Sequence, residues 1–428
     1  MTKPYEVNPA GELTIGGVTA TELVQEFQTP LYVYDVSKIR QAMQGFIQVF
    51  EAANIDYVVS FASKAFATTA MYEVAAQEGI HLDVVSGGEI STALNANYPM
   101  AHVSFNGNNK SYAELELALD NGLGTIIVDN LYELHMISEL AAARGIVQNI
   151  LMRITPGVEA HTHEFIQTGQ TDSKFGFDVN SGQAQTAYLE AQADANVNLL
   201  GVHAHIGSQI FDIVGFEAAA EKLVDIVHEW GFEPAVINTG GGFGIRYTDE
   251  DEPKPTSDFV TAIINKIQTK TAEYNMPMPA VWIEPGRSIV GPAGTSLYTI
   301  GSRKDVPGIR SYLAVDGGMG DNVRPAMYQS NYEAILATNP SAPTEQVVRV
   351  AGKYCESGDV LVWQQALPKT QPGDVLAVLA TGAYGYSMAS NYNRNPIPAV
   401  VFVENGVAKE VVARQTYADI IHLDRHYV

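Results

Sequence analysis

The chain of 428 residues contains a single cysteine, so no disulfide can form within it. Basic residues are scarce, because 25 lysines and arginines stand against 48 aspartates and glutamates and leave a formal net charge of −23. This balance argues against nucleic acid or an anionic membrane as the main partner, since both need a positive protein surface. No segment resembles a signal peptide or a transmembrane run. We therefore expect a cytoplasmic protein that binds neither nucleic acid nor membrane.

The sequence also lacks a low-complexity linker and a repeat of fixed period, and shows instead short apolar runs that alternate with segments of helical spacing. The helical segments are Ala65–Gly79, Tyr112–Gly122, Leu131–Gly145 and Gly215–Gly231. The apolar runs, which we predict to be strands, are Tyr57–Phe61, His81–Ser86, His102–Asn106, Thr125–Asp129, Asn149–Ile154, Leu199–His205, Ala235–Thr239 and Ala280–Glu284. Strands that alternate with helices indicate a parallel sheet. A doubly wound sheet shares this local pattern, but eight units favour a closed (β/α)8 barrel of the α/β class.

From about Gly294 onward, closely spaced strand signals replace the helical rhythm. They are Ser311–Val315, Gln346–Ala351, Asp359–Gln364, Asp374–Ala380 and Ala399–Val403, the last followed by the turn signal Glu404-Asn405-Gly406. Pro30–Tyr34 near the N-terminus also has strand character. We predict a barrel domain over residues 37–293, and a β-rich domain, sandwich-like or barrel-like, built from residues 1–36 and 294–428.

Reactive residue types collect at the predicted C-terminal ends of the barrel strands, where barrel enzymes keep their active sites. These residues are Lys64, Ser86, Asn106, Asp129, Arg153, His205, the Gly240-Gly241-Gly242 run, Glu284 and Arg287. Lys64 ends the first strand, where rigid support and partial desolvation would favour a nucleophilic amine able to form a Schiff base. The alternative is a lysine that only ends a strand and reaches solvent.

The glycine run and the histidines at the sixth strand end each allow two interpretations. Gly240-Gly241-Gly242 would let backbone N–H groups approach a phosphate closely, or would form an ordinary flexible loop. His203 and His205 point the same way on a strand and could bind a metal together, but no nearby carboxylate or cysteine set completes such a site. We therefore expect no metal. We favour His205 as a residue that stacks on a flat cofactor, with Ser208 as a hydrogen-bond donor to its phosphate.

The segment Glu284-Pro285-Gly286-Arg287 closes the eighth strand. A buried Glu284 could keep a pyridine nitrogen protonated, and the Arg287 fork suits a carboxylate or a phosphate. A simple ion pair between these two residues is an equally good explanation. Cys355 lies among Glu356, Ser357 and Asp359, which is typical of a reactive turn, although a lone cysteine is usually an inert core residue.

Together these motifs resemble the fold-type III pyridoxal-phosphate-dependent decarboxylases over essentially the whole chain. The resemblance rests on Ala62-Ser63-Lys64, Asp172–Gly176, His203–Gln209, the glycine run, Glu284–Arg287, Asp321–Tyr328, Cys355–Asp359 and Gly382–Gly385. It implies a barrel with a β-domain and pyridoxal 5'-phosphate as the cofactor. It also implies a homodimer with shared active sites, in which Cys355 and Glu356 come from the partner subunit.

The resemblance implies a role for each matched residue. Lys64 would hold the cofactor covalently, His205 would stack on its ring and Glu284 would bind the ring nitrogen. Gly240, Gly241, Gly242, Ser208, Gly286 and Arg287 would hold the phosphate, and Tyr384 would contact cofactor and substrate. Arg287, Arg324 and Tyr328 would bind the distal carboxylate of the substrate, Glu356 its distal ammonium, and Cys355 would deliver a proton.

Substrate identity depends on fewer residues than cofactor identity. Positive charge from Arg324 and Arg287 would repel a bare ammonium and favours a diamino dicarboxylate. The resemblance thus implies decarboxylation of meso-2,6-diaminopimelate to L-lysine, at the last step of lysine biosynthesis. The alternatives are a related decarboxylase of ornithine, lysine or carboxynorspermidine, and a non-catalytic homologue that binds partners. An amino-acid racemase would have no use for the arginine and cysteine motifs.

Overall fold

The computed structural model describes residues 3–157 and 173–428. The chain divides into two compact units. The barrel unit comprises Ala42–Gly244 and Pro253–Ser288, and the sheet unit comprises Met1–Gln41, Ile245–Glu252 and Ile289–Val428. No helix in the described ranges is long and apolar enough to cross a membrane.

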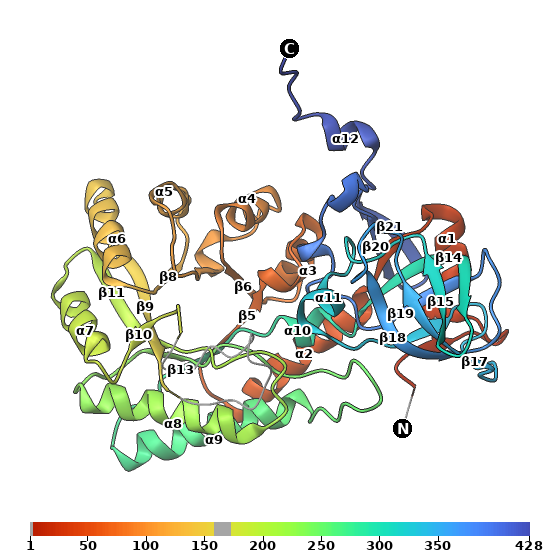
Figure 1. Ribbon diagram of the computed structural model, residues 1–428. Coiled ribbons are helices and arrows are strands. Elements are labelled where there is room, and N and C mark those ends of the chain that lie inside the picture. The colour runs from red at the N-terminus through yellow and green to blue at the C-terminus, as the bar shows by residue number, and fades with distance from the viewer. Residues whose placement is uncertain (1–2, 158–172) are drawn as a thin grey trace. The chain divides into compact units, whose positions relative to one another are not determined.

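The barrel unit is built on a closed ring of parallel strands (Figure 1). In ring order the strands are β5 (Tyr57–Ala62), β6 (His81–Val84), β7 (Val103–Phe105), β8 (Thr125–Val128), β9 (Gln148–Thr155), β11 (Val197–His203), β12 (Val236–Asn238) and β13 (Ala280–Ile283), which pairs with β5. A short strand, β10 (Phe177–Asp178), is attached to β9. Each predicted apolar run overlaps one strand of the ring, so the predicted barrel is confirmed.

The helices that follow β5, β6, β7 and β8 each begin at a capping residue. Thr68, Ser86, Ser111 and Asn130 each accept a hydrogen bond from a backbone N–H three residues later, which starts the next helix. The helices of this unit are α2 (Val36–Ala53), which enters it at Ala42, α3 (Thr69–Gln77), α4 (Gly87–Asn95), α5 (Tyr112–Asp120), α6 (Leu131–Arg144), α7 (Gln183–Ala193), α8 (Ile213–Glu229) and α9 (Thr256–Glu273). Short helical turns are η1 (Ser63–Ala65) and η2 (Met100–His102).

The sheet unit contains one large mixed sheet, as the strand signals predicted. Its main path runs β18 (Val360–Leu367), β17 (Gln346–Ala351), β15 (Arg310–Val315), β14 (Gly294–Val306), β4 (Leu31–Asp35), β20 (Ala399–Glu404) and β21 (Val407–Val412). β19 (Val375–Val378) pairs with β14 and with β16 (Ala334–Leu336). The N-terminal strand β4 thus lies inside the sheet, antiparallel to β14 and parallel to β20.

Smaller elements complete the sheet unit. They are β1 (Glu6–Val7), β2 (Leu13–Ile15), β3 (Val18–Thr19), α1 (Ala20–Phe27), α10 (Arg287–Val290) where the chain passes from one unit to the other, α11 (Arg324–Tyr328), η4 (Tyr386–Met388), η5 (Tyr392–Arg394) and α12 (Tyr417–Ile421). The predicted turn after β20 is present, and Asn405 and Gly406 both have positive φ, of 53° and 77°. Such a pair of left-handed residues matches the twist of a hairpin.

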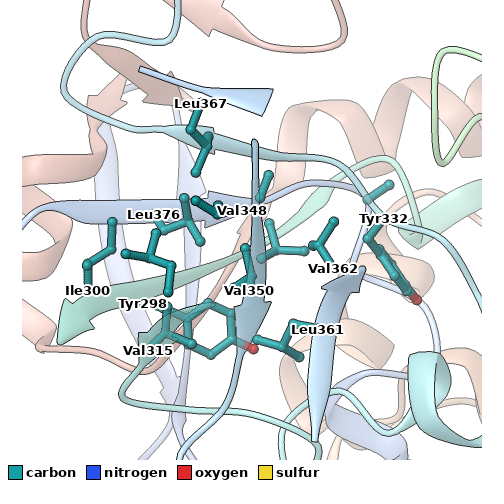
Figure 2. Packing of buried hydrophobic residues seen from close by; sticks show 14 of the residues in the cluster. Tyr298, Ile300, Val315, Tyr332, Val348, Val350, Leu361, Val362, Leu367 and Leu376 are labelled. Atoms are coloured by element: carbon teal, nitrogen blue, oxygen red, sulfur yellow. The ribbon is translucent and has the colours of Figure 1, made fainter. Parts of the chain in front are cut away.

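A buried apolar cluster holds the sheet unit together (Figure 2). Tyr298 and Ile300 of β14 pack in it with Val348 and Val350 of β17 and with Leu376 of β19. The sheet therefore forms a rigid support for the loops that leave it, including the loop that carries Cys355.

Candidate active site

Lys64 is the middle residue of η1, directly after β5. Ser63 and Ala65 on either side are buried, and Ala62 N donates to the Pro285 carbonyl at 3.0 Å, so the backbone here is fixed. The predicted rigid support is present. The predicted partial desolvation is not found, because Lys64 is exposed while its two neighbours take the buried positions of the turn.

Glu284 follows β13 and is the centre of a buried polar network. Its Oε1 accepts from Asn238 Nδ2 at 2.8 Å and from Asn106 Nδ2 at 3.3 Å. Its Oε2 lies 3.0 Å from His203 Nε2. Asn106 Nδ2 also donates to Asp83 Oδ1 at 2.6 Å. Side chains from several strands thus meet at one carboxylate at the C-terminal end of the barrel.

The pKa values of the two carboxyl groups in this network, Glu284 and Asp83, are shifted in opposite directions. Burial acts to raise the pKa of Glu284, but His203, Lys64 and the Asn238 hydrogen bond outweigh it, so the pKa of Glu284 lies below its usual value. Burial and the negative charge of Glu284 raise the pKa of Asp83. Glu284 is therefore the charged member of the pair.

The two histidines that the sequence pattern grouped together take separate places. His203 ends β11 and its Nε2 contacts Glu284, whereas His205 lies beyond the strand and accepts from Gly241 N through Nδ1 at 3.3 Å. The register of β13 brings one carboxylate, that of Glu284, to His203, a contact that the sequence pattern did not reveal. Burial, with Lys64 and Arg153 next in effect, holds the pKa of His205 well below its usual value, so its ring is neutral and flat.

The glycine run forms a close-fitting backbone loop. Gly240 and Gly242 have positive φ, of 69° and 110°. A Cβ on Gly241 would lie 2.1 Å from the Glu284 carbonyl oxygen, and one on Gly242 would lie 2.2 Å from the Gly207 carbonyl oxygen. The loop is therefore ordered by its packing, and side chains other than hydrogen do not fit there.

Arg287 and Ser208 meet beside this loop. Arg287 is buried, and its Nη2 donates to Ser208 Oγ at 2.9 Å. Gly286 packs closely against Ala62, because a Cβ added to Gly286 would lie 3.0 Å from the Ala62 Cβ. Arg287 thus meets Ser208 directly, and Gly286, its neighbour in the chain, packs against the turn that carries Lys64.

The other predicted strand-end residues have structural partners. Ser86 caps α4. Arg153 Nη1 lies 3.8 Å from Asp129 Oδ1, and the Arg153 guanidinium lies 4.2 Å from the centre of the Phe175 ring. Asp172, at the start of the motif that contains Phe175, lies outside the described residues.

These residues fit a phosphorylated pyridine aldehyde. The glycine loop is a cradle that a Cβ would fill, and Arg287 and Ser208 supply donors for a phosphate. Within the described ranges, several buried polar atoms of the strand ends have no hydrogen-bond partner, namely Ser63 Oγ, Asp83 Oδ2, Asn106 Oδ1, His203 Nδ1 and Thr239 Oγ1. Such a ligand needs a carboxylate for its ring nitrogen, a flat neutral group for the face of its ring and an amine for its aldehyde. Glu284, His205 and Lys64 offer these three groups.

Arg324 is the buried cation among the candidates of the sheet unit. It begins α11, and its Nη1 donates to Tyr332 Oη at 2.6 Å and to Tyr247 Oη at 2.9 Å. Its guanidinium lies 6.0 Å from the centre of the Tyr328 ring. Tyr332, Tyr247 and the nearby Tyr384 together outweigh burial and raise the pKa of Arg324. The cation is thus permanently charged and oriented by aromatic neighbours.

Cys355 and Glu356 lie at the tip of an anchored loop. Tyr354 and Asp359 at its ends are buried, and Tyr354 N donates to Asp359 Oδ2 at 2.8 Å. Between them Cys355 and Glu356 are exposed, and Cys355 N donates to Asn393 Oδ1 at 2.8 Å. The loop therefore presents both side chains to the outside of the unit on a fixed backbone.

Tyr384, the remaining candidate, is half-buried and has an unusual backbone. Its φ is +60°, a conformation that residues with a side chain adopt at a cost. Ala383 and Gly385 on either side are buried, so the segment has little freedom to relax. Such strain is found most often where a side chain must be held in a particular direction.

Comparison with known proteins identifies the class to which this fold and these residues belong. Residues 36–291 match the family model of the pyridoxal-binding domain of pyridoxal-dependent decarboxylases. The chain belongs to the pyridoxal-dependent decarboxylase family.

Individual relatives narrow this class. The chain is 56% identical over 414 residues to the diaminopimelate decarboxylase of Bacillus methanolicus, with 96% of each chain covered. It is 53% identical to that of Bacillus subtilis, with 97% of this chain and 96% of the relative covered. The crystal structure of diaminopimelate decarboxylase from M. jannaschii in complex with L-lysine is 36% identical, with a TM-score of 0.92 over 99% of this chain and 98% of that one.

Sequence reasoning missed two members of the Glu284 network, Asp83 and Asn238, and considered the third, His203, as a metal ligand and not as a partner of Glu284. Asp83 lies within the apolar run of β6 and Asn238 within that of β12. The available signal was a polar residue inside a strand that must be buried on both faces, which is costly unless it is hydrogen-bonded.

Proposed function

We propose that this protein catalyses the pyridoxal 5'-phosphate-dependent decarboxylation of meso-2,6-diaminopimelate to L-lysine and carbon dioxide, the last step of lysine biosynthesis. The observation that carries the proposal is the charged Glu284, held by three side-chain donors at the barrel end that also bears Lys64 and the glycine loop. The names of the relatives at 53–56% identity and the pyridoxal-binding family model support the same assignment.

When bound, the cofactor supplies an electron sink for the pair of electrons that decarboxylation leaves on the substrate carbon. Glu284 keeps its ring nitrogen protonated, because a charged carboxylate with three donors stays ionised. His205 covers the ring as a neutral imidazole. Lys64 Nζ, exposed on a fixed turn, is the amine that would hold the cofactor through its aldehyde.

The phosphate is bound by the loop around the glycine run. Gly240, Gly241, Gly242 and Gly286 bring backbone close to it, and Ser208 and Arg287 donate to its oxygens. These groups would hold the cofactor at the barrel end that also bears Glu284.

Two features select a substrate with a carboxylate and an ammonium at its distal end. Arg324, assisted by Arg287 and Tyr328, binds the distal carboxylate, and its orientation by Tyr332 and Tyr247 supports this role. Glu356 binds the distal ammonium, and Tyr384 contacts both substrate and cofactor. Ornithine offers only an ammonium to Arg324, so it should be rejected.

The proton that replaces carbon dioxide comes from Cys355 Sγ. We further propose a homodimer in which Cys355 and Glu356 serve the active site of the other subunit, and their exposure on an anchored loop supports this. Residues 37–293 would form the cofactor-binding domain, and residues 1–36 and 294–428 the β-rich domain. A cytoplasmic location agrees with the single unpaired thiol.

The test is carbon dioxide release from the purified protein with pyridoxal 5'-phosphate, measured in parallel on meso-diaminopimelate, ornithine and lysine. Release from diaminopimelate alone is expected, together with a cofactor absorbance band that Lys64→Ala abolishes and Lys369→Ala, at an exposed site, retains. Release mainly from ornithine or lysine would overturn the substrate assignment. A protein that shows neither release nor the absorbance band would be a non-catalytic homologue.

A further inference from the structure

Two buried carboxyl groups lie on either side of one amide at the C-terminal end of the barrel. Asn106 Nδ2 donates to Asp83 Oδ1 at 2.6 Å and to Glu284 Oε1 at 3.3 Å. Asp83 is 1% exposed and Glu284 is 6% exposed. Two carboxylates that share a donor in a buried site repel each other strongly, so the pair keeps one proton in the neutral pH range.

The hydrogen bonds decide which carboxyl keeps that proton. Glu284 accepts from Asn238 and His203 in addition to Asn106, and each donor stabilises its charged form. Asp83 accepts from Asn106 through Oδ1, and in the described part of the chain its Oδ2 has no partner. The proton therefore belongs on Asp83, at Oδ2.

The charges around Asp83 come from five elements of the barrel and do not reverse this assignment. They belong to Lys64 in η1, Tyr72 in α3, Glu89 in α4, Arg153 in β9 and Glu284 after β13. Lys64 and Arg153 favour an ionised Asp83. Burial and the repulsion by Glu284 are the larger effects, and the net shift of the pKa of Asp83 is upward.

We propose that Asp83 is a positioning residue, which stays protonated in the folded protein and so leaves Glu284 as the charged carboxylate of the site. The consequence for catalysis rests on the function proposed above. A single negative charge, that of Glu284, would then be available to the ring nitrogen of the cofactor, and Asp83 would not compete as a second carboxylate for the amine of Lys64. The proton count of the pair does not depend on that function.

The experiment compares the melting temperature of the full-length protein with that of Asp83→Asn between about pH 5.5 and 8.5, with and without pyridoxal 5'-phosphate. A raised pKa in the folded state makes the wild type lose stability as pH rises above the ordinary range of aspartate. Asparagine copies the shape of a protonated carboxyl and does not titrate. The melting temperature of Asp83→Asn minus that of the wild type should therefore rise by about 2 °C per pH unit. A difference that is flat or falls with pH overturns the proposal.

Two further variants guard the interpretation. Glu284→Gln keeps Asp83 and removes the charge that repels it, so its melting temperature should fall with pH no more steeply than that of the wild type. A steeper fall would overturn the proposal even if Asp83→Asn fails to fold. The matched control is Asp129→Asn, which removes a buried strand-end carboxyl whose partner is the cation Arg153 at 3.8 Å. This control should lower the melting temperature, because Arg153 loses its charged partner. Failure of the proposed function would appear separately, as a protein that binds no pyridoxal 5'-phosphate while these melting curves keep their slopes.

Discussion

His203 and Glu284 are 81 residues apart in sequence, yet His203 Nε2 lies 3.0 Å from Glu284 Oε2 at the end of the barrel. A second pair, His135 and Glu190, has nearly the same separation of 2.9 Å but lies at the surface. The side chains of the first pair are 1% and 5% exposed, and those of the second are 64% and 43% exposed. The chain therefore contains two histidine–glutamate pairs of similar geometry, one buried and one exposed to solvent.

This comparison predicts the effect of removing each histidine. His203→Phe should lower the free energy of unfolding by about 3 kcal/mol, because a buried carboxylate loses a donor that water cannot replace. His135→Phe should change it by less than about 1 kcal/mol. Urea unfolding of both variants measures the difference. Equal losses for the two would mean that burial does not strengthen the pair.

The glycine loop predicts a loss of cofactor affinity without a loss of the barrel. Gly241→Ala places a Cβ 2.1 Å from the Glu284 carbonyl oxygen, so the loop must move away from the phosphate position. The dissociation constant of pyridoxal 5'-phosphate should rise at least about tenfold, as followed by absorbance. Gly45→Ala in α2 is the control, because a Cβ added there would meet no heavy atom within 4 Å outside the backbone of its own helix. This variant should stabilise the protein by about 0.5 kcal/mol. Unchanged affinity in Gly241→Ala would remove the loop from the cofactor site.

From the proposed role of Arg324 we expect that its replacement changes substrate selectivity. Arg324→Met should lower kcat/KM for diaminopimelate by about 100-fold, because the variant loses a charged hydrogen bond to the distal carboxylate. The ratio of kcat/KM for diaminopimelate to that for ornithine should fall as well. Tyr332→Phe, which removes the acceptor 2.6 Å from Arg324 Nη1, should have a smaller effect in the same direction. Arg349→Met is the control, because Arg349 also lies over an aromatic ring, at 4.5 Å from Trp363, but takes no part in the proposed site. A selectivity that does not respond to Arg324 would contradict its role.

The proposed homodimer with shared active sites leads us to expect complementation between two inactive variants. Lys64→Ala and Cys355→Ala should each be inactive as homodimers, but a mixed dimer keeps one site with both residues intact. Mixing and refolding the two in equal amounts should therefore restore about a quarter of the wild-type activity, by random pairing of subunits. If both residues served the same subunit, mixing would restore nothing.

From the surroundings of His81 we expect that the protein loses folding stability as the pH falls, through a group outside the active site. Its ring stacks on His102 with centres 4.3 Å apart, near the N-terminal ends of β6 and β7. Burial, with His102 second, lowers the pKa of His81 to about 4. A depressed pKa means that the stabilisation is complete above the ordinary histidine range and is lost as pH falls towards 4. His81→Asn should remove about 2 kcal/mol of this acid-induced loss, whereas His426→Asn in the exposed C-terminal segment should leave the pH profile unchanged. Melting curves from about pH 7 to pH 4.5 provide the measurement.

Sequence predicted the barrel because its strands are buried runs such as Thr125–Val128, whose apolar residues stand out between capped helices. It also predicted which strand ends carry reactive groups, since a parallel barrel puts those ends on one face. It did not predict the long strand β14, whose second half is exposed and polar from Ser302 to Asp305 and so lacks an apolar pattern.

The network around Glu284 could not be read from local patterns. Its members come from β6, β11 and β12 and from the loop after β7, and their distances depend on how the ring closes and on the register of each strand. The exposure of Lys64 could not be predicted either, although its position at the end of the first barrel strand was predicted. Burial of one side chain is set by neighbours that are distant in sequence.

The place of β4 in its sheet has a consequence for how the chain is made. Leu31–Asp35 pairs along β20, in which Ala399 lies opposite Leu31, so the sheet cannot close until nearly the whole chain has been synthesised. The barrel ring needs nothing beyond Ile283, and its contacts are mostly between strands that follow one another closely. On a ribosome the barrel should therefore fold first, and the N-terminal strand should wait with its backbone unpaired until its last partner emerges.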